Sequence, residues 1–117
     1  MLAYIVEGGK RLEGEVTISG SKNSALPIIA ASILNKGIVK LYNVPDIQDT
    51  RIMFEILKKL GCKIKKNNNK VVIDSSKLIS NEIHEDLMRK MRSSVILAGS
   101  ILSARKAAVF SYPGDCD

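Results

Sequence analysis

The stretch from Ser19 to Pro27 constrains the fold most strongly, because it joins two apolar runs of different periodicity. Val16-Thr17-Ile18 alternates as a strand does, whereas the run that follows the stretch has helical spacing and continues to Leu34. Proline lacks a backbone N–H and is tolerated only in the first turn of a helix. We therefore predict a helix whose first turn contains Pro27. If Asn23 is the cap, Pro27 still lies in that first turn. Asn and Ser are both good caps, since their side-chain oxygens accept from unpaired backbone N–H groups.

A lysine at this predicted helix start points to an anion site. Lys22 and Asn23 follow a glycine-containing turn and precede the free N–H groups at the positive end of the helix dipole. Free N–H groups, the dipole and a lysine together suit phosphate above other ligands. A capped helix with a solvated lysine explains the same spacing, and spacing alone favours that explanation somewhat.

Composition narrows the class of protein and of ligand. The 117 residues, 45% of them hydrophobic, are enough for one domain with its own core. The net charge of +6 favours anionic partners. Three Tyr, two Phe and no Trp offer few stacking platforms for bases, so small phosphorylated ligands are favoured over nucleic acid. We expect no metal and no cofactor, because the chain has one His and no clustered ligand set.

Hydrophobic periodicity predicts an α/β fold in which strands and helices are interspersed. We expect strands at 4–6, 15–18, 38–42, 62–65, 71–73 and 107–110, and helices at 25–34, 52–60, 81–88 and 93–103. Gly61 is expected to end the second helix, and Cys62 to be a buried core thiol. No apolar run is long enough to cross a bilayer and no secretory segment opens the sequence, so we expect a cytoplasmic protein without membrane contact.

An internal repeat is visible when the chain is shifted by 68 residues. Ser32-Ile33-Leu34 then falls on Ser100-Ile101-Leu102, and Pro45 falls on Pro113. Both copies contain an apolar helix, a short connector, a strand and a proline turn, which suggests a duplicated α/β unit. Chance similarity between two buried helix–strand units is the alternative.

The same shift relates Lys22-Asn23-Ser24 to Lys90-Met91-Arg92. Arg92 is therefore expected at the head of the third helix, as Lys22 is at the head of the first. Two cations at equivalent helix starts would bind an anion better than one, although a surface charge at a helix end explains Arg92 equally well. The second copy stops after its proline turn, so the chain resembles a fragment of something longer.

The block from Gly14 to Pro27, GEVTISGSKNSALP, resembles the N-terminal signature of the enolpyruvyl transferase family. Further matches to that family are Asn43-Val44-Pro45, Leu60-Gly61, Met91-Arg92-Ser93-Ser94 and the proline turn with Cys116. Asn23 favours the branch that acts on UDP-N-acetylglucosamine, because the sister branch that makes 5-enolpyruvylshikimate 3-phosphate has a serine after the lysine.

The resemblance implies a fold of repeated βαβαββ units in an inside-out α/β barrel, incomplete here. It also implies two parts of this chain: residues 1–21, a strand pair that belongs to the other domain of a full-length enzyme, and residues 22–117, the first part of the N-terminal domain.

The implied activity transfers the enolpyruvyl group of phosphoenolpyruvate to the 3′-hydroxyl of UDP-N-acetylglucosamine, an early step of peptidoglycan synthesis. By motif match, Lys22 and Asn23 contact phosphoenolpyruvate and Arg92 lines the substrate site. Cys116 matches the loop cysteine that donates a proton and is alkylated by fosfomycin. Asp115 replaces a glycine of the family pattern, and its charge would raise the pKa of a neighbouring thiol.

Two other functions fit the sequence. A truncated, non-catalytic chain would bind a partner or associate with itself through its unfinished repeat. A small basic nucleic-acid binder is favoured by charge alone. As a fragment, the chain is expected to have no turnover on its own.

Overall fold

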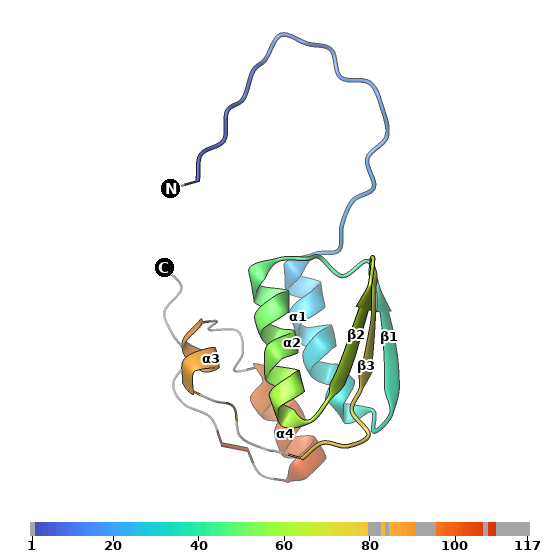
Figure 1. The fold of residues 1–117 in the computed structure, drawn as a ribbon, viewed down its shortest axis with the longest axis vertical. Helices are drawn as coiled ribbons and strands as arrows, with labels where there is room; N and C mark the ends of the chain where they lie inside the picture. The colour runs from blue at the N-terminus through green and yellow to red at the C-terminus, as the bar shows by residue number, and fades with distance from the viewer. Residues whose placement is uncertain (1, 80–82, 84, 91–95, 107, 110–117) are drawn as a thin grey trace.

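The structure is a computed structural model, and it describes residues 2–79, 83, 85–90, 96–106 and 108–109. Its helices are α1 (Lys22–Ala31), which a 3-10 turn at Ser32–Leu34 continues, α2 (Gln48–Leu60), α3 (Glu85–Lys90) and α4 (Leu97–Arg105) (Figure 1). Its strands are β1 (Ile38–Tyr42), β2 (Lys63–Asn67) and β3 (Lys70–Asp74). The interspersed helices and strands confirm the α/β class, and the three strands form a partial sheet, not a closed barrel.

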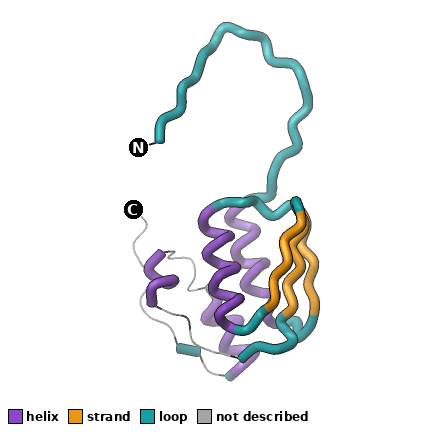
Figure 2. The backbone as a smooth tube through the Cα atoms, viewed as in Figure 1, coloured by secondary structure: helices purple, strands orange, loops and turns teal. Residues whose placement is uncertain are grey.

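The sheet has the order β1-β3-β2, and β3 is antiparallel to both of its neighbours. Val71 and Ile73 of β3 are buried, and Val39 and Ile64 pair with Ile73 on the same face. Alternation at period 2 therefore gives the sheet one apolar face. Helices α1 and α2 lie side by side along it (Figure 2). Lys63 and Lys65 of β2 are exposed, as expected for a hairpin with lysines on its outer face.

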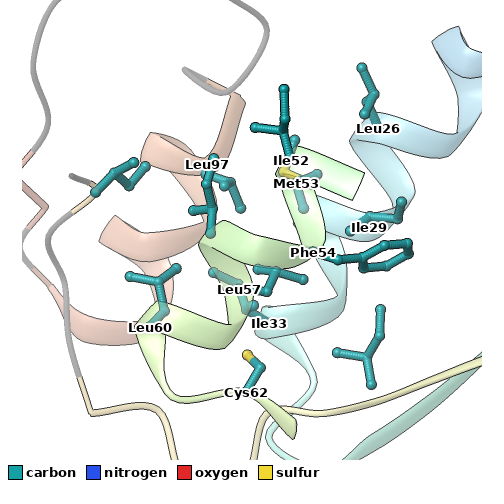
Figure 3. Close-up of a cluster of buried hydrophobic side chains, with 14 of the residues drawn as sticks. Leu26, Ile29, Ile33, Ile52, Met53, Phe54, Leu57, Leu60, Cys62 and Leu97 are labelled. Carbon is teal, nitrogen blue, oxygen red and sulfur yellow. The ribbon is translucent and has the colours of Figure 1, made fainter. Parts of the chain in front are cut away.

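The core lies between these two helices and the sheet, and α4 adds to it (Figure 3). Apolar residues of α2 recur at helical spacing, so that Met53, Leu57 and Leu60 are fully buried. Ile29 and Ile33 contribute the facing surface of α1. This packing holds the two helices parallel, with both of their N-termini at the same end of the molecule (Figure 1).

Gly61 ends α2 as predicted, in a left-handed conformation with φ 113°. A Cβ at this position would lie 2.6 Å from the carbonyl oxygen of Lys77, so the tight turn requires glycine. Cys62, the next residue, is the predicted core thiol and is 5% exposed. Burial raises the pKa of this thiol to about 11.

The start of α1 differs from the prediction. The helix begins at Lys22, its N-cap is Ser21 and not Asn23, and the cap makes no side-chain hydrogen bond. Pro27 therefore lies inside the helix and not in its first turn. Its ring nitrogen has no hydrogen to donate to the carbonyl of Asn23. Both residues are exposed, so water can solvate this carbonyl, which explains why the helix continues through the proline.

The two strands predicted at 4–6 and 15–18 are not formed. Residues 2–20 run as an extended arm away from the sheet (Figure 2). The apolar side chains that suggested strands are highly exposed, from 77% to 94%, and they are Tyr4, Ile5, Val6, Val16 and Ile18. A strand needs a partner for its backbone groups and a surface that covers its apolar face. Among the described residues, the backbone of the arm is hydrogen-bonded only where Ile18 and Gly20 meet Asn43, and its apolar side chains stay uncovered.

The 68-residue repeat appears in the burial of the two helices. Ile29 and Leu97, its equivalent, are both fully buried. Ile28 and its equivalent Ile96 are both partly exposed, at 51% and 39%. α4 begins at Leu97, whereas the prediction began at 93, and residues 91–95 lie outside the described part.

The other predictions for the C-terminal part were only partly met. The helix predicted at 81–88 is α3, at Glu85–Lys90. In the strand predicted at 107–110, Val109 makes a single bridge and its carbonyl accepts from the N–H of Ile83 at 2.9 Å, while 107 and 110 lie outside the described residues.

Candidate functional site

The segment before Lys22 is fixed against the end of β1 by two hydrogen bonds to Asn43. The N–H of Gly20 donates to the carbonyl oxygen of Asn43 at 3.1 Å, and the Asn43 amide donates to the carbonyl oxygen of Ile18 at 3.2 Å. A Cβ on Gly20 would collide with the Asn43 carbonyl, so this close approach requires glycine. The glycine-containing turn thus sets where Lys22 begins α1.

The start of α2 is fixed by a buried hydroxyl. The Thr50 oxygen lies 2.7 Å from the carbonyl oxygen of Pro45 and 2.9 Å from that of Ile47. It also accepts from the N–H of Ile47 at 3.3 Å, and Thr50 is 1% exposed. This network positions the first turn of α2, which contains Asp49.

An ion pair joins the two helix starts. Lys22 Nζ lies 2.5 Å from Asp49 Oδ2, and the two side chains are 52% and 24% exposed. A lysine in the first turn opposes the helix dipole, and α1 has no acidic residue there to offset it. Asp49 supplies that negative charge from the neighbouring helix. The pair is partly solvated, so it contributes little to stability.

Asn23 follows Lys22 in the first turn of α1 and is exposed. The prediction that these two residues stand at a helix N-terminus is confirmed. Their side chains are therefore next to backbone N–H groups that have no partner within the helix. Chemically, this arrangement offers an anion one ammonium group, one amide and several backbone donors.

The two other predicted site residues, Arg92 and Cys116, lie outside the described residues, as does Asp115. Whether they share a hollow with Lys22 stays a prediction. Asp49 is a residue of this site that the sequence analysis did not single out. Its contact with Lys22 depends on how two helices pack, which no spacing within one helix reveals.

A hollow of about 190 Å³ lies beside the start of α1. Its lining is mostly apolar and includes Ser24 and Ile28 of α1 and Tyr42 of β1, but not Lys22, Asn23 or Asp49. The hollow thus borders the first turn of α1 at Ser21 and Ser24, on a side that these three side chains do not line. Its apolar walls suit a packed side chain better than a phosphate.

Within the described residues, no cluster of three His, Cys, Asp or Glu side chains is placed to bind a metal. None of the helices described has the length and apolar content to cross a membrane.

Comparison with known proteins places these features in a family. The profile of the family described as EPSP synthase (3-phosphoshikimate 1-carboxyvinyltransferase) matches residues 6–117. A UDP-N-acetylglucosamine 1-carboxyvinyltransferase 2 of Caldanaerobacter subterraneus is 46% identical over 97% of this chain and 27% of its own. A UDP-N-acetylglucosamine 1-carboxyvinyltransferase of Desulfatibacillum aliphaticivorans is also 46% identical, over 96% of this chain and 27% of its own.

Among solved structures, the enolpyruvyl transferase NikO from Streptomyces tendae matches with a TM-score of 0.75 and 29% identity. The match covers 86% of this chain and 24% of NikO. The chain thus spans about a quarter of the length of the proteins it resembles.

Proposed function

We propose, because this chain belongs to the EPSP synthase family of enolpyruvyl transferases, that it is the N-terminal part of a UDP-N-acetylglucosamine 1-carboxyvinyltransferase. The whole enzyme would transfer the enolpyruvyl group of phosphoenolpyruvate to the 3′-hydroxyl of UDP-N-acetylglucosamine and release phosphate. That reaction supplies peptidoglycan synthesis, and hence cell-wall growth and division, in the cytoplasm.

The observation that carries this proposal is the position of Lys22 at the first residue of α1, with Asn23 beside it. An ammonium group, an amide and free backbone N–H groups form a suitable cradle for an anion that also changes its charge distribution during reaction. Phosphoenolpyruvate has a phosphate and a carboxylate on three carbons. Lys22 and the α1 N-terminus would hold one of these groups, and Asn23 would donate to the carbon centre that becomes tetrahedral.

The chemistry consists of an addition followed by an elimination. The sugar hydroxyl gives its proton to a base from a later part of the whole enzyme as its oxygen bonds to C2 of phosphoenolpyruvate. A second proton goes to the methylene carbon C3, and the C2–C3 double bond becomes single. Cys116 is proposed as the donor of that proton, and Arg92 as a cation that lines the substrate site. Loss of a proton from C3 and of phosphate from C2 then restores the double bond in the product.

The arm is proposed to belong to the second domain of the whole enzyme. Residues 1–21 would pair there as strands, and residues 22–117 would begin the N-terminal domain. Support comes from the exposed, alternating side chains of Val16 and Ile18, which suit a strand that has a partner.

Two alternatives follow from specific observations. The family description names 3-phosphoshikimate as a substrate, so the sister reaction is the nearest competitor. The names of the relatives and Asn23 favour UDP-N-acetylglucosamine instead. The exposed arm also suits a non-catalytic chain that associates with itself.

Phosphate release from phosphoenolpyruvate tests these assignments. A full-length protein that carries this chain is expected to release phosphate with UDP-N-acetylglucosamine and not with shikimate 3-phosphate. The 117-residue chain alone is expected to release none. Turnover with shikimate 3-phosphate only would move the protein to the sister branch, and turnover by the isolated chain would refute the view that it is one part of an active site.

A further inference from the structure

The contact between Lys22 and Asp49 is unusual for an anion site, because a carboxylate beside the cation repels the anion that the cation is meant to bind. A 2.5 Å contact nevertheless joins the two side chains. The N-terminus of α2 partly offsets the charge of Asp49, which lies in that helix's first turn. At this end of the molecule, one carboxylate therefore lies among an ammonium group and two helix N-termini.

A lysine side chain is a compact charge on a flexible four-carbon stem, so it needs help to hold one position. Asp49 is well placed to give that help, because Thr50, its buried neighbour, is fixed by contacts within hydrogen-bonding distance at the start of α2. The ammonium group has three donors, and a single bond to Asp49 uses one of them.

We propose that Asp49 is a positioning residue for Lys22: its carboxylate holds the ammonium group over the N-terminus of α1, so that the anionic substrate meets a cation already in place. This inference rests on the proposed function, in which Lys22 binds phosphoenolpyruvate. Pre-orientation acts on the rate, because a displacement of about 1 Å in a reacting site costs on the order of a hundredfold.

Asp46 offers a matched control. It precedes the same helix, but it pairs with Arg51, whose guanidinium nitrogens Nε and Nη2 lie 2.7 Å and 3.0 Å from its two carboxylate oxygens. Asp46→Asn therefore removes one acidic charge and one ion pair from the start of α2 without removing the partner of Lys22. An effect of Asp49 on net charge alone would be shared by both substitutions.

The main test is kinetic and uses a full-length protein that carries this chain. Asp49→Asn is expected to lower kcat/KM for phosphoenolpyruvate about tenfold to a hundredfold, with partial rescue by Asp49→Glu. Asp46→Asn is expected to stay within about twofold, as surface ion pairs usually do. In a Lys22→Met background, Asp49→Asn is expected to cause no further loss, since the two residues would act as one unit.

Equal losses for the two asparagine variants, or a loss from Asp49→Asn that persists in the Lys22→Met background, would overturn the proposal. A second measurement tests the role of Asp49 independently of the proposed function. In the ¹⁵N-labelled 117-residue chain, NMR detects the Lys22 ammonium group by its slow proton exchange. We expect this signal in the native chain and in Asp46→Asn, and its loss in Asp49→Asn.

An ammonium signal that is unchanged in Asp49→Asn would contradict the positioning role even if the enzyme is active. If the full-length protein turns over neither acceptor, the proposed function fails, and the ammonium signal still decides the role of Asp49.

Discussion

The extended arm (residues 2–20) and the folded body (residues 22–74) have similar hydrophobic periodicity and opposite outcomes. Val16 and Ile18 of the arm stand two residues apart, as Val71 and Ile73 of β3 do, so each pair would lie on one face of a strand. The β3 residues are at most 4% exposed, whereas those of the arm are at least 77% exposed. The two segments differ in their neighbours, because β3 lies between two strands and under two helices. This spacing therefore allows a segment to form a strand, but the strand forms only where neighbouring elements pair with its backbone and cover its apolar face.

The largest expected difference between the two regions is in how much stability is lost when an apolar side chain is removed. Leu57→Ala is expected to lower the free energy of unfolding by about 2–5 kcal/mol, because Leu57 is fully buried among other core residues. Ile18→Ala in the arm is expected to change it by less than about 0.5 kcal/mol. Urea unfolding of the two variants measures both values. A comparable cost at Ile18 would mean that the arm packs on the body.

Glycine substitutions test the same difference between the body and the arm, at the level of the backbone. Gly61→Ala is expected to cost about 2–3 kcal/mol, because it combines a left-handed φ of 113° with a Cβ that lies 2.6 Å from a carbonyl oxygen. Gly8→Ala in the arm, where a Cβ meets nothing within 4 Å, is the control and is expected to be nearly neutral. Thermal unfolding reports both, and a stable Gly61→Ala variant would contradict the close contact with Lys77.

A pH dependence is expected from the thiol buried in the body. The pKa of Cys62 is raised to about 11 from an ordinary value of 9.0, first by burial and then by the charge of Asp74. The folded state therefore favours the neutral thiol. The stability that this preference contributes is complete below about pH 9 and is lost as the pH rises toward 11. The full shift from 9.0 to about 11 corresponds to a loss of about 3 kcal/mol, since one pKa unit corresponds to about 1.4 kcal/mol.

Urea unfolding of the native chain and of Cys62→Ala at pH 8 and pH 11 isolates this contribution from the other groups that titrate. The stability difference between the two proteins is expected to shrink at the higher pH. Parallel loss of stability in both proteins would mean that the thiol is not buried.

The smallest expected effect on stability belongs to removal of the arm. Deletion of residues 2–17 is expected to leave the free energy of unfolding within about 0.5 kcal/mol, because the arm covers none of the core. Any self-association of the 117-residue chain is expected to weaken, since exposed apolar side chains leave with the arm. Sedimentation velocity of both chains measures this. Unchanged association after deletion would place the contact on the body.

Sequence reasoning succeeded where local chemistry decides the structure. β1 was predicted at its observed bounds, and Gly61 was predicted to end α2 because a helix C-terminus favours glycine. It failed where distant contacts decide. The start of α1 is set by the hydrogen bonds of Gly20 and Ile18 to Asn43, not by the position of Pro27.

The candidate site was likewise predicted only in part. Lys22 and Asn23 were placed at a helix start from their neighbours in the chain, and the structure agrees. Asp49 was missed as a partner of Lys22, because the parallel packing of α1 and α2 brings together residues that are far apart in sequence. The roles of Arg92 and Cys116 rest on resemblance.

The measurement that tests the central claim most directly is phosphate release by the full-length protein after Lys22→Met, compared with Lys36→Met. Lys36 is an exposed lysine beyond the opposite end of α1, so it controls for loss of one positive charge. If Lys22 holds the anionic substrate at the helix start, kcat/KM for phosphoenolpyruvate falls by about a hundredfold to a thousandfold in Lys22→Met and stays near native in Lys36→Met. Equal activity of the two variants would contradict that claim.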